Sequence, residues 1–386
     1  MKFKRQIFGF MDMLRFKKLV PNRRKMLASG SITPLKKTYR VNEQAKRLHP
    51  GYMQVKLVEI RKISQTMTEL TFNRVDSNAF PYFRAGQYVT IQAHIAGSIV
   101  SRPYSIVSTP KDALSNKLVL GIEEQGFMSK YLCHEAKLGD AFMMLEPAGE
   151  FHYETLRDKK NIVCIAGGSG ITPFMSMLNA KAQGTEDYDV TLFYGARDVK
   201  HLAYKDELDK LAQNGIKVIY VLSDEENPNM EHGFIGIDLI KKYVNINDST
   251  FFLCGPKAMY DYIIPALKEA GLENKYIHKD ASCCTDLNIE NPRSFNIVVH
   301  MQDETYNVKA MENETILVAL ERAKLNVPSK CRAGGCGFCH AKLVSGEFLI
   351  AKDRDGRREA DKKFGFIHPC VTYPLSDMEI IVNEAY

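Results

Sequence analysis

Residues 331–339 read Cys331-Arg-Ala-Gly-Gly-Cys336-Gly-Phe-Cys339, and a fourth cysteine, Cys370, follows alone after a long gap. This C-x₄-C-x₂-C spacing with a distant fourth thiol is the ligand pattern of a plant-type [2Fe–2S] cluster. The glycines between the cysteines lack the Cβ atoms that would keep the backbone from wrapping closely around the sulfurs. A structural Cys₄ zinc site is the alternative, but such sites usually have short C-x₂₋₄-C pairs at both ends. We therefore predict a cluster held by Cys331, Cys336, Cys339 and Cys370.

The composition is that of an ordinary globular protein. The 386 residues are 45% hydrophobic and 25% charged, and this length predicts two or three domains. No apolar run is long enough to cross a bilayer, and the N-terminus lacks the hydrophobic region of a signal peptide. Nine cysteines without a secretory signal fit a reducing compartment, so we expect a cytoplasmic protein without a disulfide framework.

The N-terminal 50 residues form a basic arm. They carry fourteen Lys or Arg against two acids, whereas the remaining chain has 38 basic and 44 acidic residues. Apolar residues recur at helical spacing in this arm: Phe3, Ile7, Phe10, Met11 and Leu14. One interpretation is an amphipathic helix that contacts an anionic membrane or an acidic partner. We favour an arm on the protein's own surface with solvated charges, and a mitochondrial presequence is a third interpretation. Nucleic-acid binding is not predicted, because no recognition motif accompanies the arm.

Three patterns follow the arm. From about Val55 to Glu150, short β-rich runs alternate with Gly, Pro and Asn turns, which predicts a small barrel. From Asn161, apolar strands alternate with helical segments, which predicts a parallel sheet. From Ser294, hairpin-like strands and an amphipathic segment at 316–324 precede the cysteine loop, and residues 282–293 resemble a linker.

Two short motifs lie in the barrel region. Arg102-Pro103-Tyr104-Ser105 ends a strand: Tyr104 can stack on a planar ring, Ser105 can bond the ring's redox nitrogen, and the planar guanidinium of Arg102 suits a pyrophosphate. The second motif, Gly126-Phe127-Met128-Ser129, opens a helix whose free N–H groups favour an anion. Alone, the first would be an ordinary turn and the second a plain helix cap. Together and in order they are far more specific.

Two more motifs lie at strand ends of the parallel-sheet region. Ile165-Ala-Gly-Gly-Ser-Gly-Ile-Thr-Pro173 runs from a strand through glycines into a helix, which predicts a phosphate-bearing ligand at the helix N-terminus. It is neither G-x-G-x-x-G nor a Walker loop. The second motif, Cys254-Gly255-Pro256, follows the last apolar strand, at the sheet edge where such folds bind ligands. Cys254 is either a buried structural thiol or, as we predict from this placement, part of the site.

In this order, the motifs resemble the ferredoxin-NADP reductase superfamily. With the C-terminal module, residues 52–386 resemble the iron–sulfur flavoprotein reductases that serve aromatic-ring oxygenases or hybrid-cluster protein. The resemblance implies that Arg102 to Ser105 hold the flavin, and that Gly126, Phe127, Met128 and Ser129 bind a pyrophosphate, which favours FAD over FMN. It implies a nicotinamide nucleotide site at Gly167, Gly168, Gly170 and Thr172. Cys254, Gly255 and Pro256 would lie beside the nicotinamide ring, where hydride leaves, so Ser105 and Cys254 are the candidate catalytic residues.

Two positions depart from the family pattern. Many NADPH-selective members have Arg after Ser at the end of the second nucleotide strand, whereas this chain has Ser223-Asp224. A carboxylate would repel a 2′-phosphate and suit a ribose hydroxyl, so we predict NADH over NADPH; alternatively, Asp224 merely begins an acidic loop. The family's acid and aromatic residue near the flavin correspond here to His278-Lys-Asp-Ala-Ser, where Asp280 replaces the acid and the aromatic is missing.

These observations predict a multidomain fold of three modules: an antiparallel Greek-key β-barrel for FAD, an α/β parallel-sheet domain and a β-grasp ferredoxin domain. We expect the basic extension at 1–51, the FAD-binding barrel at 52–155 and the nucleotide-binding α/β domain at 156–282. A linker at 283–293 would then lead to the ferredoxin domain at 294–386. The predicted activity passes electrons from NADH through FAD and the cluster to a separate acceptor protein. Two alternatives stay open: an electron carrier with an inactive nucleotide site, and a membrane-docked redox subunit recruited by the arm.

Overall fold

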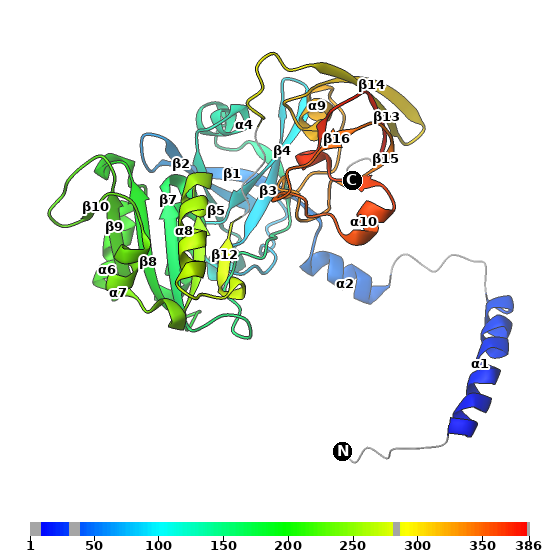
Figure 1. Cartoon of the computed structure of the whole chain (residues 1–386), viewed down its shortest axis with the longest axis horizontal. Helices are drawn as coiled ribbons and strands as arrows, with labels where there is room; N and C mark the ends of the chain where they lie inside the picture. Colours follow the sequence, from blue (N-terminus) through cyan, green and yellow to red (C-terminus); the bar gives the residue numbers. More distant parts are fainter. Residues whose placement is uncertain (1–8, 31–38, 281–285, 384–386) are drawn as a thin grey trace. The chain divides into compact units, whose positions relative to one another are not determined.

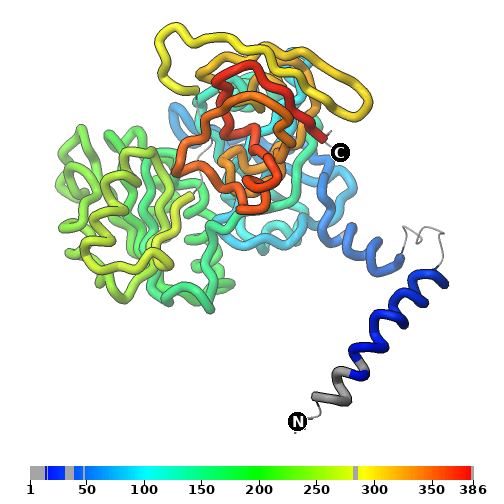
Figure 2. Tube along the Cα trace, turned by 45° about the vertical axis from the view of Figure 1, so that its right-hand side comes forward, coloured from blue at the N-terminus to red at the C-terminus, as the bar shows by residue number. Residues whose placement is uncertain are grey.

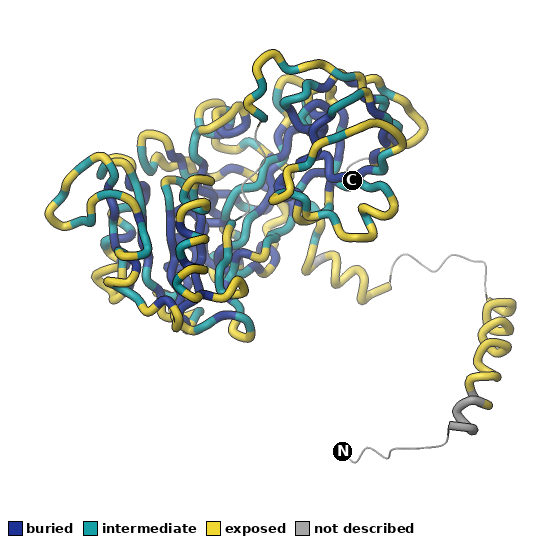
Figure 3. Tube along the Cα trace, viewed as in Figure 1, coloured by how far each residue is buried: buried dark blue, intermediate teal, exposed yellow. Residues whose placement is uncertain are grey.

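The computed structural model describes residues 9–30, 39–280 and 286–383, which fall into two compact units, Met1–Arg47 and Leu48–Tyr386. In the first unit, helix α1 spans Gly9–Ala28, and helix α2 (Arg40–Leu48) begins near its end. The residues of both helices whose burial is described are exposed, as the yellow trace in Figure 3 shows. Phe10, Met11 and Leu14 lie in α1, as their helical spacing predicted. Phe3 and Ile7 lie outside the described residues. Among the helices described, none is long and apolar enough to span a membrane.

The second unit begins with a six-stranded antiparallel barrel (Figure 1). Its strands are β1 (Tyr52–Lys62), β2 (Met67–Arg74), β3 (Tyr88–Ile95), β4 (Ser98–Ser105), β5 (Leu118–Glu123) and β6 (Ala141–Leu145). The order is β4-β3-β6-β1-β2-β5, and a bridge between Ile106 and Leu120 joins the two ends of the sheet. Alternate residues of β1, such as Val55 and Leu57, are fully buried, because one face of each strand lines the core. Short helices α3 (Pro110–Leu114) and α4 (Phe127–Lys130) interrupt the connections.

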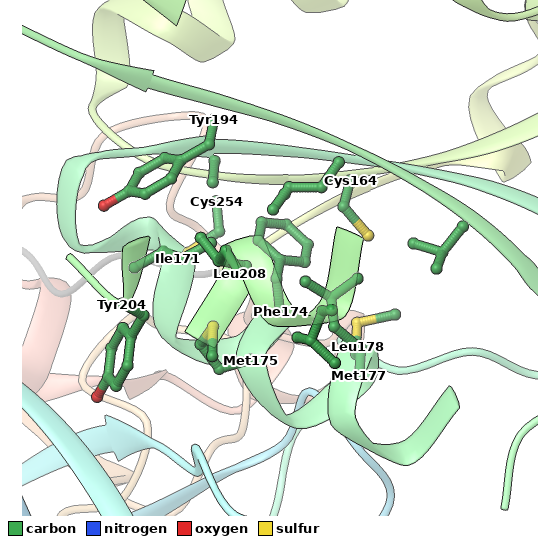
Figure 4. Packing of buried hydrophobic residues seen from close by; sticks show 14 of the residues in the cluster. Cys164, Ile171, Phe174, Met175, Met177, Leu178, Tyr194, Tyr204, Leu208 and Cys254 are labelled. Carbon is green, nitrogen blue, oxygen red and sulfur yellow. The ribbon is translucent and has the colours of Figure 1, made fainter. Parts of the chain in front are cut away.

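A six-stranded parallel sheet follows the barrel. Its strands are β7 (Asn161–Gly167), β8 (Asp189–Ala196), β9 (Lys217–Leu222), β10 (Glu231–His232), β11 (Ser249–Cys254) and β12 (Ile277–Lys279). Helices α5 (Thr172–Ala182) and α6 (Lys205–Gln213) cover one face, and α7 (Ile237–Tyr243) and α8 (Lys257–Glu269) cover the other. Cys164 on β7 packs with Phe174 and Leu178 of α5 (Figure 4), whereas Ile165 packs on the opposite face. Because both faces are covered, β7 is a continuous apolar run.

The strand order β10-β9-β8-β7-β11-β12 reverses direction at β7. The chain moves outward from β7 through β8, β9 and β10, and then returns to add β11 and β12 on the other side. At this point the chain leaves β7 and β11 toward opposite faces of the sheet, into α5 and α8, at the carboxyl ends of the strands, where open α/β sheets bind ligands in a crevice. The glycine motif at 165–173 and the Cys254-Gly255-Pro256 motif both lie at this edge, at the ends of β7 and β11.

Beside the barrel's own core, one hydrophobic cluster joins the barrel to the parallel sheet. Met67, Val107 and Val119 of the barrel belong to the same buried cluster as Phe174 and Met177 of α5. The contact is close: a Cβ added at Gly121 of β5 would lie 2.6 Å from the Thr172 methyl group and 2.7 Å from the Tyr204 hydroxyl. The start of α5 is therefore fixed against the barrel.

The C-terminal module has a five-stranded sheet in the order β14-β13-β19-β15-β17. These strands are β13 (Ser294–Met301), β14 (Glu304–Met311), β15 (Ala341–Ser345), β17 (Phe366–Ile367) and β19 (Met378–Val382). Helix α9 (Ile316–Arg322) packs its apolar side on them, α10 (Glu359–Lys363) lies near the edge, and β16 (Phe348–Leu349) pairs with β18 (Tyr373–Pro374). The parallel pairing of β13 with β19, with a helix packed on the sheet, is the β-grasp arrangement. Figure 2 shows this module in yellow to red.

The predicted multidomain fold class is confirmed, with barrel, parallel sheet and β-grasp module in the expected order. The described part of the predicted linker, 286–293, contains no helix or strand. Its end lies on the β-grasp module, because Leu287 N–H donates to the Asn313 carbonyl and Arg293 pairs with Glu312. The neighbouring Cys283 and Cys284 lie outside the described residues.

Candidate functional site

The glycine turn after β7 is pressed against the Cys254-Gly255-Pro256 loop after β11. A Cβ added at Gly170 would lie 1.9 Å from the Cys254 carbonyl oxygen, and one at Gly167 would lie 2.8 Å from the Pro256 ring. Neither position tolerates a side chain unless backbone moves. Gly167 and Gly170 are therefore required because the loops after β7 and β11 pack directly against each other.

Gly168 has a different role in the same turn. Its φ is +56°, in the left-handed region, and no heavy atom of the described chain lies within 4 Å of its added Cβ. This open side is where a ligand can approach the backbone. Thr172 instead turns inward: its hydroxyl donates to the Ser169 carbonyl at 3.0 Å and its side chain is buried. Thr172 thus shapes the turn more than it lines the open side.

Cys254 lies at the centre of a small polar network. Its Sγ is 3.4 Å from Asp280 Oδ2, and Asp280 N–H donates to the Leu253 carbonyl. Tyr260 on α8 accepts from Gly255 N–H at 3.0 Å and donates to the Asp280 carbonyl at 3.4 Å. Burial, and then the Asp280 carboxylate, raise the pKa of Cys254 well above its ordinary value. The sulfur is therefore a neutral thiol that donates to Asp280.

Tyr260 was not predicted from the sequence. Its position one turn into the helix after Cys254-Gly255-Pro256 was the available signal, since such a residue points back toward the loop. Asp280, suggested as a replacement for the family's acid, does lie beside Cys254.

Ser223 and Asp224 follow β9 on the same sheet edge. Their N–H groups donate to the carbonyls of Ala196 and Arg197, and Ser223 Oγ donates to Asp224 Oδ1 at 2.6 Å. Asp224 is exposed. The acidic side chain thus ends a strand two positions from β7 in the sheet, on the edge that carries the glycine turn.

The four residues of the barrel motif lie at the end of β4. In the β3–β4 pair, Ile91 faces Arg102, Thr90 faces Pro103 and Val89 faces Tyr104. All four motif residues, including Ser105, are half-buried. The Arg102 guanidinium lies 5.3 Å from the ring centre of Phe127, the first residue of α4. The structure therefore brings the two predicted flavin motifs together, although 24 residues separate their first positions in the sequence.

The loop at Gly126 is held by Ser129. Ser129 Oγ accepts from the N–H groups of Gln125 and Gly126, both at 2.9 Å, and donates to the Gly126 carbonyl. Met128 is buried in the barrel core. Ser129 thus fixes the loop, and the open side of Gly126 has no described heavy atom within 4 Å of an added Cβ.

The four predicted cluster ligands approach one another in two pairs. Cys331 lies close enough to Cys336, and Cys370 to Cys339, for the second thiol of each pair to shift the pKa of the first. The Cys336 thiol, aided by N–H groups of Ala333, Cys336 and Gly335, lowers the pKa of Cys331 to about 5. Among the residues described, no group of three or more His, Cys, Asp or Glu is gathered to hold a single ion. Two pairs of soft thiols are the donor set of a two-iron cluster, in which each iron has two protein ligands.

The loop around these thiols depends on its glycines. Gly334 has a φ of +79°, and a Cβ there would lie 2.3 Å from the Arg354 carbonyl oxygen. Gly337 has a φ of +70°, and Gly335 is open on its Cβ side, with no described heavy atom within 4 Å. His368 is buried and donates from Nδ1 to the Gly334 carbonyl at 2.8 Å, so it supports the loop through a hydrogen bond.

The C-terminal module contacts both the barrel and the parallel-sheet module. Glu321 on α9 pairs with Arg102 of the barrel and with Arg332 of the cysteine loop. Asp353 and Arg354, from the charged segment between Cys339 and Cys370, line a pocket together with Tyr260 and Asp280 of the parallel-sheet module. The two predicted nucleotide sites and the cysteine loop are therefore parts of one continuous region.

Three family models match the chain in sequence order. They are the oxidoreductase FAD-binding domain over residues 54–153, the oxidoreductase NAD-binding domain over 164–264 and the 2Fe-2S iron-sulfur cluster binding domain over 299–375. The chain belongs to the ferredoxin-NADP reductase superfamily, in the branch with a C-terminal ferredoxin domain. It is an oxidoreductase whose domains bind FAD, NAD and a [2Fe–2S] cluster.

Several curated relatives cover most of the chain. The 3-ketosteroid-9-alpha-monooxygenase ferredoxin reductase component of Mycobacterium tuberculosis is 29% identical, over 78% of this chain and 86% of its own. The NADH oxidoreductase HCR of Escherichia coli is 25% identical, over 83% and 96%. The glycine betaine monooxygenase reductase subunit of Chromohalobacter salexigens is 22% identical, over 83% and 93%.

A solved structure of phthalate dioxygenase reductase matches with a TM-score of 0.64 and 23% identity, covering 86% of this chain and 98% of that one. This likeness extends over all three modules of the fold. This likeness confirms the fold predicted from the sequence, and the three matching family models confirm the superfamily and the three cofactor types.

Proposed function

We propose that this protein is the NADH-dependent reductase component of an oxygenase system, passing electrons singly to a separate acceptor protein. The observation that carries this proposal is the bridge between the flavin strand and the cysteine loop, in which Glu321 of α9 pairs with both Arg102 and Arg332. Several relatives are named as reductase subunits of monooxygenases, which supports an oxygenase as the acceptor. When bound, FAD accepts a hydride and releases single electrons, which a [2Fe–2S] cluster can take.

At the flavin site, the chain's residues would mainly bind and orient. Arg102 would pair with a phosphate, Tyr104 would stack on the ring, and Ser105 would bond the ring's redox nitrogen. The open loop at Gly126, fixed by Ser129, would receive the pyrophosphate. We also propose, from the family resemblance, that Pro103, Phe127 and Met128 contact the flavin nucleotide.

At the nucleotide site, Gly167 and Gly170 would let the two loops pack closely, and Gly168 would let the dinucleotide approach the backbone. Cys254 would place a neutral thiol beside the nicotinamide ring, with Gly255 and Pro256 shaping the loop. Asp280 and Tyr260 would keep that thiol in place. Hydride transfer would then depend on geometry rather than on acid–base help.

We propose NADH as the donor because Asp224 occupies the position, after Ser223 at the end of β9, where many NADPH-selective members of the family carry an arginine. Glu225 and Glu226 follow it, and the Glu225 carboxylate accepts from Val199 N–H at 3.1 Å. The local field is therefore negative, which favours a ribose hydroxyl over a phosphate.

A second acceptor class is favoured by one relative, the NADH oxidoreductase HCR. Its name mentions no oxygenase, so its likeness supports an acceptor protein other than an oxygenase. A bare electron carrier is disfavoured because the glycine turn and the Cys254 loop are packed together intact. Cytoplasmic location, the role of the basic arm at a membrane, and the boundaries 52–155, 156–282 and 294–386 all remain proposals.

The experiment is anaerobic reduction of the purified holoprotein with NADH and, separately, NADPH, followed by addition of a one-electron acceptor such as cytochrome c. We expect NADH to bleach the flavin faster than NADPH does, and cytochrome c to be reduced only when the cluster is present. Equal rates with both nucleotides would contradict the donor assignment, and absence of bleaching would contradict the reductase itself.

A further inference from the structure

Glu321 is a buried carboxylate shared by two arginines from different modules. It lies on α9 with 6% of its surface exposed. Its Oε1 is 2.7 Å from Arg332 Nη1, and its Oε2 is 3.2 Å from Arg102 Nη1. Arg102 belongs to the flavin motif on β4, and Arg332 directly follows the cluster ligand Cys331. One carboxylate therefore joins the flavin strand to the cysteine loop.

Charged side chains buried together lower the stability of the fold unless each of them is closely paired. Burial of a charged group is unfavourable without close partners, and removal of one partner leaves the others uncompensated. Arg332 is itself 6% exposed and has a φ of +54°, a conformation that side chains other than glycine rarely adopt. Its bond to Glu321, with a longer one to Ser329 Oγ at 3.4 Å, holds the loop in this conformation.

The residue before Cys331 is anchored on the barrel as well. The Lys330 carbonyl accepts from Thr90 Oγ1 at 3.0 Å, and Lys330 Nζ lies 3.3 Å from Glu146 Oε1. Thr90 pairs with Pro103 in the β3–β4 register, one position from Arg102. Cys331 thus stands between two residues that are both tied, directly or through Glu321, to the hairpin that carries the flavin motif.

We propose that Glu321 is a positioning residue for internal electron transfer, holding the Cys331 side of the cluster against the flavin strand through Arg102 and Arg332. The inference rests on the proposed reductase function. In each passage one electron leaves the reduced flavin, which is oxidised, and enters the cluster, which is reduced; NADH supplies the electron pair. No bond forms at this step, so the distance and orientation between the two centres decide its rate.

The test compares Glu321→Gln with Glu314→Gln in the full-length holoprotein. Glu314 is a suitable control because it is also buried, at 8% exposed, and bonds to Arg322 and the Met311 N–H within the ferredoxin module. Stopped-flow spectroscopy would measure flavin reduction by NADH and cluster reduction as separate phases. Hydrogen–deuterium exchange of the oxidised protein would report the order of residues 329–336.

With Glu321→Gln we expect flavin reduction to stay within about two-fold and cluster reduction to slow by about ten-fold or more, because small misplacements of reacting groups cost that much. Exchange in 329–336 should become faster. Glu314→Gln should change neither quantity. Cluster reduction at the wild-type rate in Glu321→Gln, with unchanged exchange, would overturn the proposal.

Glu321→Asp keeps the test decisive if Glu321→Gln fails to fold or load its cluster. The shorter carboxylate retains the charge, so we expect a rate per loaded cluster between those of wild type and a protein lacking the contact. A wild-type rate in Glu321→Asp would then count against the proposal. Failure of the wild-type flavin to bleach with NADH would instead refute the proposed function and leave the variants without relevance to it.

Discussion

Gly170 and Cys254 meet backbone to backbone across the crevice between β7 and β11. An added Cβ at Gly170 would lie 1.9 Å from the Cys254 carbonyl oxygen, well inside van der Waals contact. This contact fixes the distance between the glycine turn and the Cys254-Gly255-Pro256 loop, and so defines the opening of the nucleotide site.

We therefore predict that Gly170→Ala disrupts the nucleotide site. The added methyl group would have to displace backbone, which we expect to cost about 2 kcal/mol or more in the free energy of unfolding. Gly51→Ala is the matched control, because no described heavy atom lies within 4 Å of its Cβ and its φ is not positive. Thermal unfolding and NADH-dependent flavin bleaching check both variants. A Gly170→Ala protein as stable and as active as Gly51→Ala would contradict the account.

A second prediction concerns the charge beside Cys254. Burial and the Asp280 carboxylate both raise the pKa of this thiol, so it should stay protonated, and react slowly with iodoacetamide, up to about pH 9. Asp280→Asn removes the negative charge that disfavours the thiolate. The pKa should fall while burial keeps it raised, and alkylation should therefore begin at lower pH than in the wild type.

Mass spectrometry of Cys254 after timed alkylation, from about pH 7 to 10, measures this shift. Cys133 provides an internal reference, because burial raises its pKa and it lies in the barrel. Rapid alkylation of wild-type Cys254 at neutral pH would show that the thiol is not held neutral.

Nucleotide preference should depend on Asp224. Asp224→Arg replaces the repelling carboxylate with a guanidinium that can pair with a 2′-phosphate. We expect the ratio of kcat/KM for NADPH to that for NADH to rise by about ten-fold or more, a gain of about 1.4 kcal/mol. Glu226→Arg makes the same charge change two residues further along the exposed loop. An equal rise in both variants would indicate a general field effect and no specific 2′ site.

Loss of one cluster ligand should separate the two halves of the reaction. Cys370 is 3% exposed and lies beside the Cys339 thiol. Cys370→Ser therefore removes one of the two sulfurs that would hold one iron of the cluster. We expect little iron and acid-labile sulfide, loss of cytochrome c reduction, and retained NADH-dependent reduction of ferricyanide, which accepts electrons from the flavin. Cys133→Ser, a half-buried thiol outside the cysteine loop, should keep both reactions. Loss of ferricyanide reduction in Cys370→Ser, but not in Cys133→Ser, would contradict the prediction that the flavin is reduced by NADH without the cluster.

The sequence predicted the features that depend on local spacing. Three cysteines at C-x₄-C-x₂-C spacing and glycines directly after apolar strands restrict the backbone within a few residues, so their positions could be inferred without a structure. The alternation of strands and helices likewise indicated the parallel sheet, because its buried strands are continuous apolar runs.

Contacts between distant residues could not be inferred in this way. Arg102 and Glu321 are 219 positions apart, and neither position's residue type specifies the other as its partner. The inward-turned hydroxyls of Ser129 and Thr172 are a second example: their residue types suit a phosphate equally well, and only the fold shows that both bond to nearby backbone. Tyr260 belongs to the same class, since its contact with Gly255 depends on the direction in which α8 leaves the loop.

The most direct test of the central claim is rapid anaerobic mixing of the holoprotein with NADH, following flavin absorbance and the cluster's electron paramagnetic resonance signal together. The account predicts that flavin bleaching comes first and that the signal of the reduced cluster rises afterwards, at a rate independent of NADH concentration. A cluster signal that rises without prior bleaching, or flavin that bleaches while the cluster stays oxidised, would contradict it.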